Sequence, residues 1–171
     1  MTQQSLFNSV GPSGAHFSDC RKYRYALWRI WDTSKPFVMF IGLNPSTANE
    51  TEADPTIKSV MRIAKHNGYG GVYMMNCFAY VSTNPDDLRM ENNQDLNDFW
   101  LNNIALECKG IVFSWGNFEI VKTTGRFREI VRMFGEGAMA LKQNKNGSPK
   151  HPLYCKSDTS FIKFEYNKYE V

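Results

Sequence analysis

Side chains that could bind a polar ring, and help to break a bond beside it, follow apolar stretches of the sequence. Asn44 and Asn76 each end such a stretch, and a side-chain amide can both donate and accept hydrogen bonds. An amide can therefore hold a water molecule or pair with the edge of a pyrimidine or purine. His151 stands between two prolines, where its imidazole could stabilise a leaving group that departs as an anion. These three residues predict a site for ligand binding or hydrolysis.

Other candidate ligand-binding residues lie close to these three in the sequence. They are Gly42, Leu43, Pro45, Ser46, Phe78, Trp115, Asn117 and Lys150. Pro45 would stiffen the turn next to Asn44, because its ring restricts the backbone. Lys150 belongs to a basic loop that could hold a phosphate group.

A structural role remains an alternative for each of the most informative candidates. Asn44 suits a tight turn, because asparagine tolerates the left-handed conformation. Asn76 could hydrogen-bond the backbone of the loop that follows it. His151 could be an exposed loop residue, and Trp115 could simply pack at the end of a strand.

Strand and helix patterns alternate along the chain and would position these residues. Strands are predicted over residues 37–43, 70–76, 110–116 and 138–142. Helices are predicted over residues 55–67, 94–107 and 118–134. Such alternation favours a parallel sheet with helices on both faces. Ligands of these sheets bind beyond the carboxyl ends of the strands, so the polar residues after the four strands should meet at one edge.

The two ends of the chain are expected to extend this sheet. Residues 1–20 are rich in small and polar residues and predict an irregular leader. Residues 23–31 alternate in the manner of a strand, which could form a hairpin with residues 37–43. The alternating tail, residues 160–171, predicts an edge strand. Without a repeat or a linker, residues 1–171 are expected to form a single α/β domain.

The helix patterns also predict which side chains face the core. Asp54 and Pro55 suit the N-cap and the first position of the first helix. The second helix is expected to bury Leu96, Phe99, Trp100 and Ala105. Basic residues of the helices are expected to face water, namely Arg62, Lys65, Arg126, Arg128 and Arg132.

Composition narrows the class of protein. A hydrophobic fraction of 42% can build a core without metal or disulfides, and a net charge of +3 permits nucleic-acid contact without requiring it. The four cysteines lack metal-site spacing, so no metal and no cofactor is predicted. The start of the chain has no signal-peptide pattern, and no apolar run approaches a membrane span of ~18 residues. We therefore expect a cytoplasmic protein with reduced thiols and no membrane contact.

Four sequence segments together resemble a known family. The segments are GLNPSTANETEADPTI, YMMNCFAY, SWGN and HPLY. They are similar to DUF1643, a family found in bacteria and phages, and the resemblance spans about residues 23–155.

The same segments, in the same order, more distantly resemble the uracil-DNA glycosylase superfamily. That resemblance implies a three-layer α/β/α fold with a central four-stranded parallel sheet, here with an added N-terminal strand or hairpin. It implies that Asn44 positions the attacking water and that Asn76 reads the base edge. It also implies that His151 contacts the base carbonyl oxygen. HPLY matches the late His-Pro-x-Pro-Leu motif of that superfamily only in part, through His151, Pro152 and Leu153. Phe78 and Tyr80 are the candidates for a stacking aromatic.

The function implied by the resemblance is hydrolysis of an N-glycosidic bond in nucleic acid or in a nucleotide. Asn44 and His151 would then be catalytic, and the other candidates would bind the base. One alternative is a binder of a base or nucleotide that keeps the fold without catalysis. Another is an interaction protein of phage or defence systems whose surface, not its pocket, is functional.

Overall fold

The computed structural model describes residues 11–88 and 94–169 of the chain, and these form one mixed sheet with helices on both faces. The strands are β1 (Ser13–Phe17), β2 (Arg24–Ile30), β3 (Phe37–Gly42), β4 (Gly71–Asn76), β5 (Gly110–Phe113), β6 (Met139–Ala140) and β7 (Ile162–Lys163). The α-helices are α1 (Pro55–His66), α2 (Gln94–Glu107), α3 (Ile120–Thr123) and α4 (Arg126–Phe134). Short 3-10 turns are η1 (Pro85–Asp87), η2 (Pro152–Tyr154) and η3 (Tyr166–Lys168).

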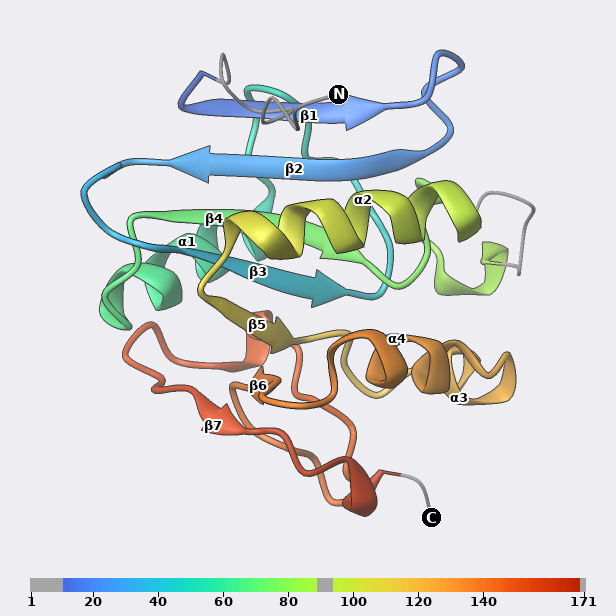
Figure 1. Cartoon of the computed structure of the whole chain (residues 1–171). Coiled ribbons are helices and arrows are strands. Elements are labelled where there is room, and N and C mark those ends of the chain that lie inside the picture. The colour runs from blue at the N-terminus through green and yellow to red at the C-terminus, as the bar shows by residue number, and fades with distance from the viewer. Residues whose placement is uncertain (1–10, 89–93, 170–171) are drawn as a thin grey trace.

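The sheet has a parallel centre and antiparallel margins (Figure 1). Its strand order is β1-β2-β4-β3-β5-β6-β7, and β4, β3, β5 and β6 run parallel to one another. β2 is antiparallel to β4, and β7 is antiparallel to β6 at the edge. The predicted α/β class is confirmed. A strand lies within each predicted strand range, but three strands are shorter than predicted: β5 ends at Phe113, β6 covers residues 139–140, and the edge strand β7 covers residues 162–163.

The predicted hairpin between residues 23–31 and 37–43 is wrong, because β4 lies between β2 and β3. The connection between them is bonded to Gly70, directly before β4. The backbone N–H groups of Trp31 and Asp32 donate to Gly70 O, and Gly70 N–H donates to Pro36 O. The connection thus spans the start of β4 and leaves room for that strand.

The irregular leader is also wrong in part. Residues 13–17 form β1, which pairs antiparallel with β2, whereas residues 1–10 lie outside the described part of the chain. The small and polar residues of β1 carry no alternation that would reveal a strand. Its position follows from main-chain hydrogen bonds to β2, which contribute without regard to side chain.

Alternate residues of the central strands point into two separate cores. Val38 and Phe40 of β3 pack with α1 on one face, and Met39 and Ile41 pack with α2 and α4 on the other. Figure 1 shows α1 behind the sheet and α2 and α4 in front of it. Coverage of both faces explains why β3 is apolar without interruption.

The two later helices differ from expectation. In α2, Leu96 and Phe99 are 44% and 49% exposed, while Asn97, Leu101 and Ile104 are the buried residues. Apolar residues surround the axis of α2, so the sequence does not identify the face that meets the sheet. The third predicted helix breaks near Gly125 into α3 and α4. No helix of the described chain is both long and apolar enough to span a membrane.

Candidate functional site

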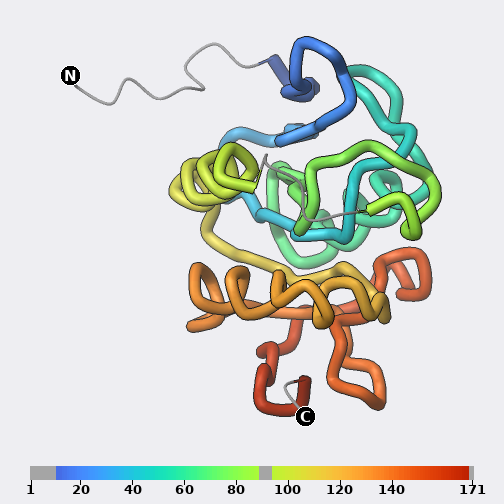
Figure 2. Tube along the Cα trace, turned by 90° about the vertical axis from the view of Figure 1, so that its right-hand side faces the viewer, coloured from blue at the N-terminus to red at the C-terminus, as the bar shows by residue number. Residues whose placement is uncertain are grey.

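A cavity of about 140 Å³ lies at the edge where the parallel strands end, the edge that faces the viewer in Figure 2. Its walls come from the ends of β3 and β4, the start of β2, the N-terminus of α1 and the loops before η1, α3 and η2. Six predicted site residues line it: Gly42, Leu43, Asn44, Ser46, Asn76 and His151. Residues up to 109 positions apart in sequence are thus brought together at this edge, as the alternation of strands and helices predicted.

The other five predicted residues do not line this cavity. Phe78 and Trp115 are buried in the core that faces α2 and α4, where Trp115 Nε1 donates to Tyr169 Oη at 3.4 Å. Asn117 is exposed and accepts a hydrogen bond from Asn146. The two remaining residues, Pro45 and Lys150, contribute backbone hydrogen bonds to the surrounding loops.

Asn44 joins two loops of the site. Its Nδ2 donates to the carbonyl oxygens of Pro45 at 2.9 Å, Tyr80 at 3.3 Å and Ser82 at 2.8 Å. These bonds fix the amide orientation and leave Oδ1 without a donor among the described residues. Asn44 can therefore accept a hydrogen bond from a ligand or water, but its donor side is already occupied.

Asn76 has the opposite arrangement. Asn76 is only 2% exposed, yet its side-chain amide has no hydrogen-bond partner in the described part of the chain. Asn76 Oδ1 lies over Gly42, where an added Cβ would come within 2.9 Å of it. Because Asn76 lines the cavity, this amide is available for a ligand that supplies hydrogen bonds to it.

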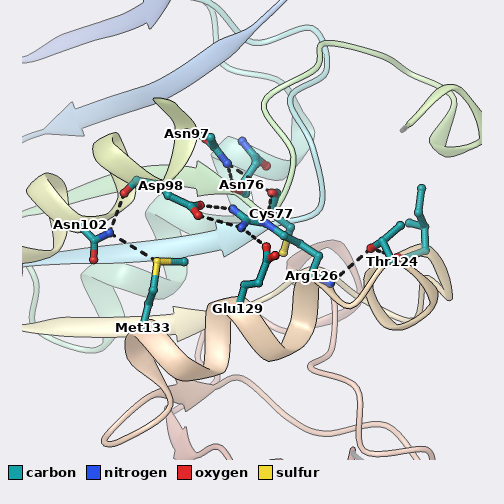
Figure 3. A network of polar contacts seen from close by, with 10 residues as sticks. Asn76, Cys77, Asn97, Asp98, Asn102, Thr124, Arg126, Glu129 and Met133 are labelled. Atoms are coloured by element: carbon teal, nitrogen blue, oxygen red, sulfur yellow. Dashed lines mark hydrogen bonds and ion pairs between the residues drawn. The ribbon is translucent and has the colours of Figure 1, made fainter. Parts of the chain in front are cut away.

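The backbone behind Asn76 is held by side chains from two helices (Figure 3). Asn97 Nδ2 of α2 donates to Asn76 O at 3.0 Å and to Cys77 O at 3.3 Å. Arg126 Nε of α4 donates to Cys77 O at 2.7 Å. These bonds fix the end of β4 and, with it, the direction of the Asn76 side chain.

Arg126 was expected in water, but it is 0% exposed. Its guanidinium bonds Asp98 at 2.5 and 3.2 Å and Glu129 at 2.7 Å. Burial disfavours its charge, but these carboxylates outweigh that effect and raise the pKa of Arg126. The break at Gly125 starts α4 at this residue and so directs it toward the end of β4 instead of solvent.

His151 lines the cavity, and one of its two ring nitrogens has a hydrogen-bond partner among the described residues. Its Nδ1 accepts the backbone N–H of Leu153 at 3.2 Å, so the neutral imidazole carries its proton on Nε2. Burial lowers the pKa of His151 below its ordinary value of 6.5, although the charge of Asp54 opposes this shift. The imidazole is therefore neutral at pH 7.

Phe118 lines the cavity. Phe78 and Tyr80, the predicted candidates for a stacking aromatic, do not line it. Phe118 is half-buried in the loop between β5 and α3. Beside it, Gly116 has a positive φ of 79°, and a Cβ there would come within 3.3 Å of both His151 and Phe118. The turn is thus restricted to glycine by its conformation and by its neighbours.

Sequence reasoning missed two charged residues of the cavity, Arg24 and Asp54. Arg24 is 3% exposed, its Nη1 donates to Ala48 O at 2.9 Å, and its Nε has no partner in the described chain. Burial lowers the pKa of Arg24 to about 10. Asp54 caps α1 by accepting the N–H of Ile57 at 2.9 Å, as predicted. A helix that starts at the carboxyl edge of a sheet places its N-cap there, which was the available signal for Asp54.

The family match covers every residue that lines the cavity. A family model described as "Protein of unknown function (DUF1643)" matches residues 24–153, most of the chain. The chain belongs to DUF1643. The match begins at Arg24 and extends past His151, so both ends of the cavity lining lie within it. Searches of the curated proteins and of the solved structures found no match to this DUF1643 protein.

The side chains of the DUF1643 cavity can perform acid–base and hydrogen-bond chemistry. They provide one carboxylate, one buried guanidinium, one neutral imidazole and two amides. In the described residues, no group of three or more His, Cys, Asp or Glu side chains could hold a metal ion.

Replacing Gly116 with alanine should destabilise the DUF1643 protein and disturb His151. The positive φ should cost about 1–2 kcal/mol of unfolding free energy, and the new methyl group should press on His151 and Phe118. The measurements are chemical denaturation and the imidazole NMR resonances of His151. Gly125→Ala is a matched control, because Gly125 has a φ of 76° with nothing within 4 Å of the added Cβ. Equal His151 shifts in the two variants would contradict the contact.

Proposed function

We propose that the cavity binds a nucleobase and that the protein hydrolyses an N-glycosidic bond in nucleic acid or in a nucleotide. The observation that carries this proposal is the pairing of two groups in one cavity. The buried Asn76 amide lacks a partner among the described residues, and His151 offers a neutral Nε2–H. Together they match the polar edge of a base, which presents both donors and acceptors.

The size of the cavity supports a single ring as ligand. A cavity of about 150 Å³ accommodates a benzene-sized ring, and this one measures about 140 Å³. It is smaller than the pockets of ~300 Å³ and above that take drug-sized ligands. The base would therefore enter alone, extruded from its strand, while sugar and phosphate remain at the mouth.

The architecture supports the distant resemblance to the uracil-DNA glycosylase superfamily. Four parallel strands with helices on both faces form the centre of the sheet. Three of the matching segments lie at the ends of β3, β4 and β5, the fourth lies at η2, and together they supply Asn44, Asn76 and His151 to one cavity. A similar fold alone does not assign an activity, so the proposed function depends on the side chains that line the cavity.

The chemistry would proceed by departure of the base as an anion. The bond between the sugar carbon and the base nitrogen breaks, and the electron pair leaves with the base. His151 Nε2–H would donate to the base oxygen on which the negative charge develops, and a water oxygen would bond to the sugar carbon. The attacking water loses one proton and the expelled base takes up one proton, so the products are the free base and the hydroxylated sugar.

One observation favours a second function, a base or nucleotide binder without catalysis. The donors of Asn44 are occupied by three backbone carbonyls, so this residue is held as a structural element of two loops. A binder of this kind would gain thermal stability from its ligand and show no turnover. A role as a phage or defence interaction protein would leave pocket variants indistinguishable from wild type in the cell.

The deciding experiment pairs base release with binding. Wild-type protein should release base from a panel of uracil-, mismatch- and modified-base DNA and nucleotides. Asn76→Ala should weaken binding of the released base about 10- to 100-fold, because a bidentate amide contact is worth roughly 1–3 kcal/mol. Thermal stabilisation by free base measures this loss. Asn167→Ala, an exposed asparagine in η3, is the control and should bind as wild type.

The possible outcomes separate the functions. Base release together with the Asn76 effect supports the hydrolase. Stabilisation by a base without turnover supports the binder. Absence of both release and stabilisation across the panel contradicts the proposal of a nucleobase site.

A further inference from the structure

Asp54 lines the cavity, and its role as a helix cap uses only one of its two carboxylate oxygens. One oxygen, Oδ1, accepts the N–H of Ile57 at 2.9 Å, which completes the N-cap of α1. The second oxygen has no hydrogen-bond or ion-pair partner in the described residues, although Asp54 lines the cavity. The carboxylate therefore has a free acceptor at the site.

The surroundings of Asp54 place its charge among the groups that would act on a ligand. Burial lowers the pKa values of Arg24 and His151. The negative charge of Asp54 acts in the opposite direction on both of these pKa values. Arg24 also lines the cavity, is 3% exposed and has an unpartnered Nε. A carboxylate so placed can attract a positive charge or a proton that develops nearby.

Asn44 cannot take the same role. Its Nδ2 is bonded to three carbonyl oxygens, and an amide oxygen is a much weaker base than a carboxylate. Its free Oδ1 can accept a hydrogen bond from a water molecule and so orient it. A second group must then remove the proton of that water.

We propose, on the basis of the proposed function, that Asp54 is the general base that activates the attacking water and faces the cationic sugar. The Asp54 carboxylate takes a proton from the water as the water oxygen bonds to the sugar carbon. The bond from that carbon to the base nitrogen breaks, its electron pair leaves with the base, and His151 stabilises the anion. The expelled base is protonated afterwards, and Asp54 returns its proton to solvent, so charge and atoms balance.

Two variants separate this role from helix capping. Asparagine and serine cap helices about as well as aspartate, so Asp54→Asn and Asp54→Ser should unfold at nearly the wild-type denaturant concentration. Base release should nevertheless fall about 100- to 10,000-fold in both, the range for loss of a general base. Added formate should partly restore release in Asp54→Ser, because the smaller side chain leaves room for an external carboxylate. Wild-type rates in Asp54→Asn would overturn the proposal while leaving the proposed function intact.

A second measurement does not depend on turnover. DNA in which one sugar is replaced by a cationic pyrrolidine imitates the charge of the reacting sugar, and tetrahydrofuran DNA is its neutral counterpart. Wild-type protein should bind the pyrrolidine DNA at least about 10-fold more tightly than the neutral DNA at low salt, and Asp54→Asn should lose this preference. A preference kept by Asp54→Asn, or absent from the wild type, overturns the role of Asp54. Failure of the proposed function shows separately, as absence of base release and of stabilisation by free base.

Discussion

Replacing His151 with alanine should lower base release about 100- to 1000-fold, the usual loss when one donor to a developing anion is removed. Nδ1 of this imidazole is occupied by the Leu153 N–H, so Nε2–H is the donor that the substitution removes from the cavity. The measurement is single-turnover release of base. His66→Ala is a matched control, because His66 is exposed in the last turn of α1 and should release base at the wild-type rate.

The same prediction has a pH dependence with a defined sign. Burial lowers the pKa of His151 below 6.5, so the neutral, Nε2-protonated form persists at and above that pH. Protonation at lower pH places a second proton on Nδ1 and breaks its bond with Leu153. Release should therefore stay level down to about pH 6.5 and fall below it. A decline that begins well above pH 6.5, or a rate unaffected by His151→Ala, would contradict the assignment of this donor.

Replacing Arg126 with methionine should lower the free energy of unfolding by about 3–5 kcal/mol. The substitution removes the hydrogen bonds to Asp98 and Glu129 and leaves Cys77 O with only the longer bond from Asn97. For a chain of this length the melting temperature should fall by roughly 6–20 °C. Thermal and urea denaturation measure both quantities.

Arg128→Met provides the comparison on the same helix. Arg128 is exposed, and surface substitutions of this kind usually change stability by less than about 0.5 kcal/mol. If the two variants were equally stable, the polar network behind β4 would not contribute to folding. Because this network fixes the backbone of Asn76, Arg126→Met should also weaken base binding when measured below its melting temperature.

The features that the sequence predicted correctly are those with a local signal. The uninterrupted apolar run of β3 identified a strand covered on both faces, and Asp54-Pro55 marked the start of α1. Given parallel strands, the approach of Asn44, Asn76 and His151 followed from topology, because their segments all end at one edge.

The features that were missed depend on tertiary contacts. The position of β4 between β2 and β3 depends on bonds to Gly70, and the face of α2 depends on Asn97 reaching the end of β4. Arg126 resembles a surface residue in sequence because its partner Asp98 is 28 positions away. Arg24 has the sequence pattern of an ordinary strand residue at the start of β2, and its place in the cavity depends on the tertiary structure.

The three carbonyl bonds of Asn44 have a consequence for motion. Two of them, to Tyr80 O and Ser82 O, join the loop after β3 to the loop after β4, and Ser82 N–H adds a bond to Pro45 O. Neither loop can open without breaking the same set of hydrogen bonds, so the two form one cooperative unit with a shared opening free energy. A ligand that enters the cavity therefore meets a preorganised wall, and the conformational entropy of ordering that wall is lost during folding instead of binding.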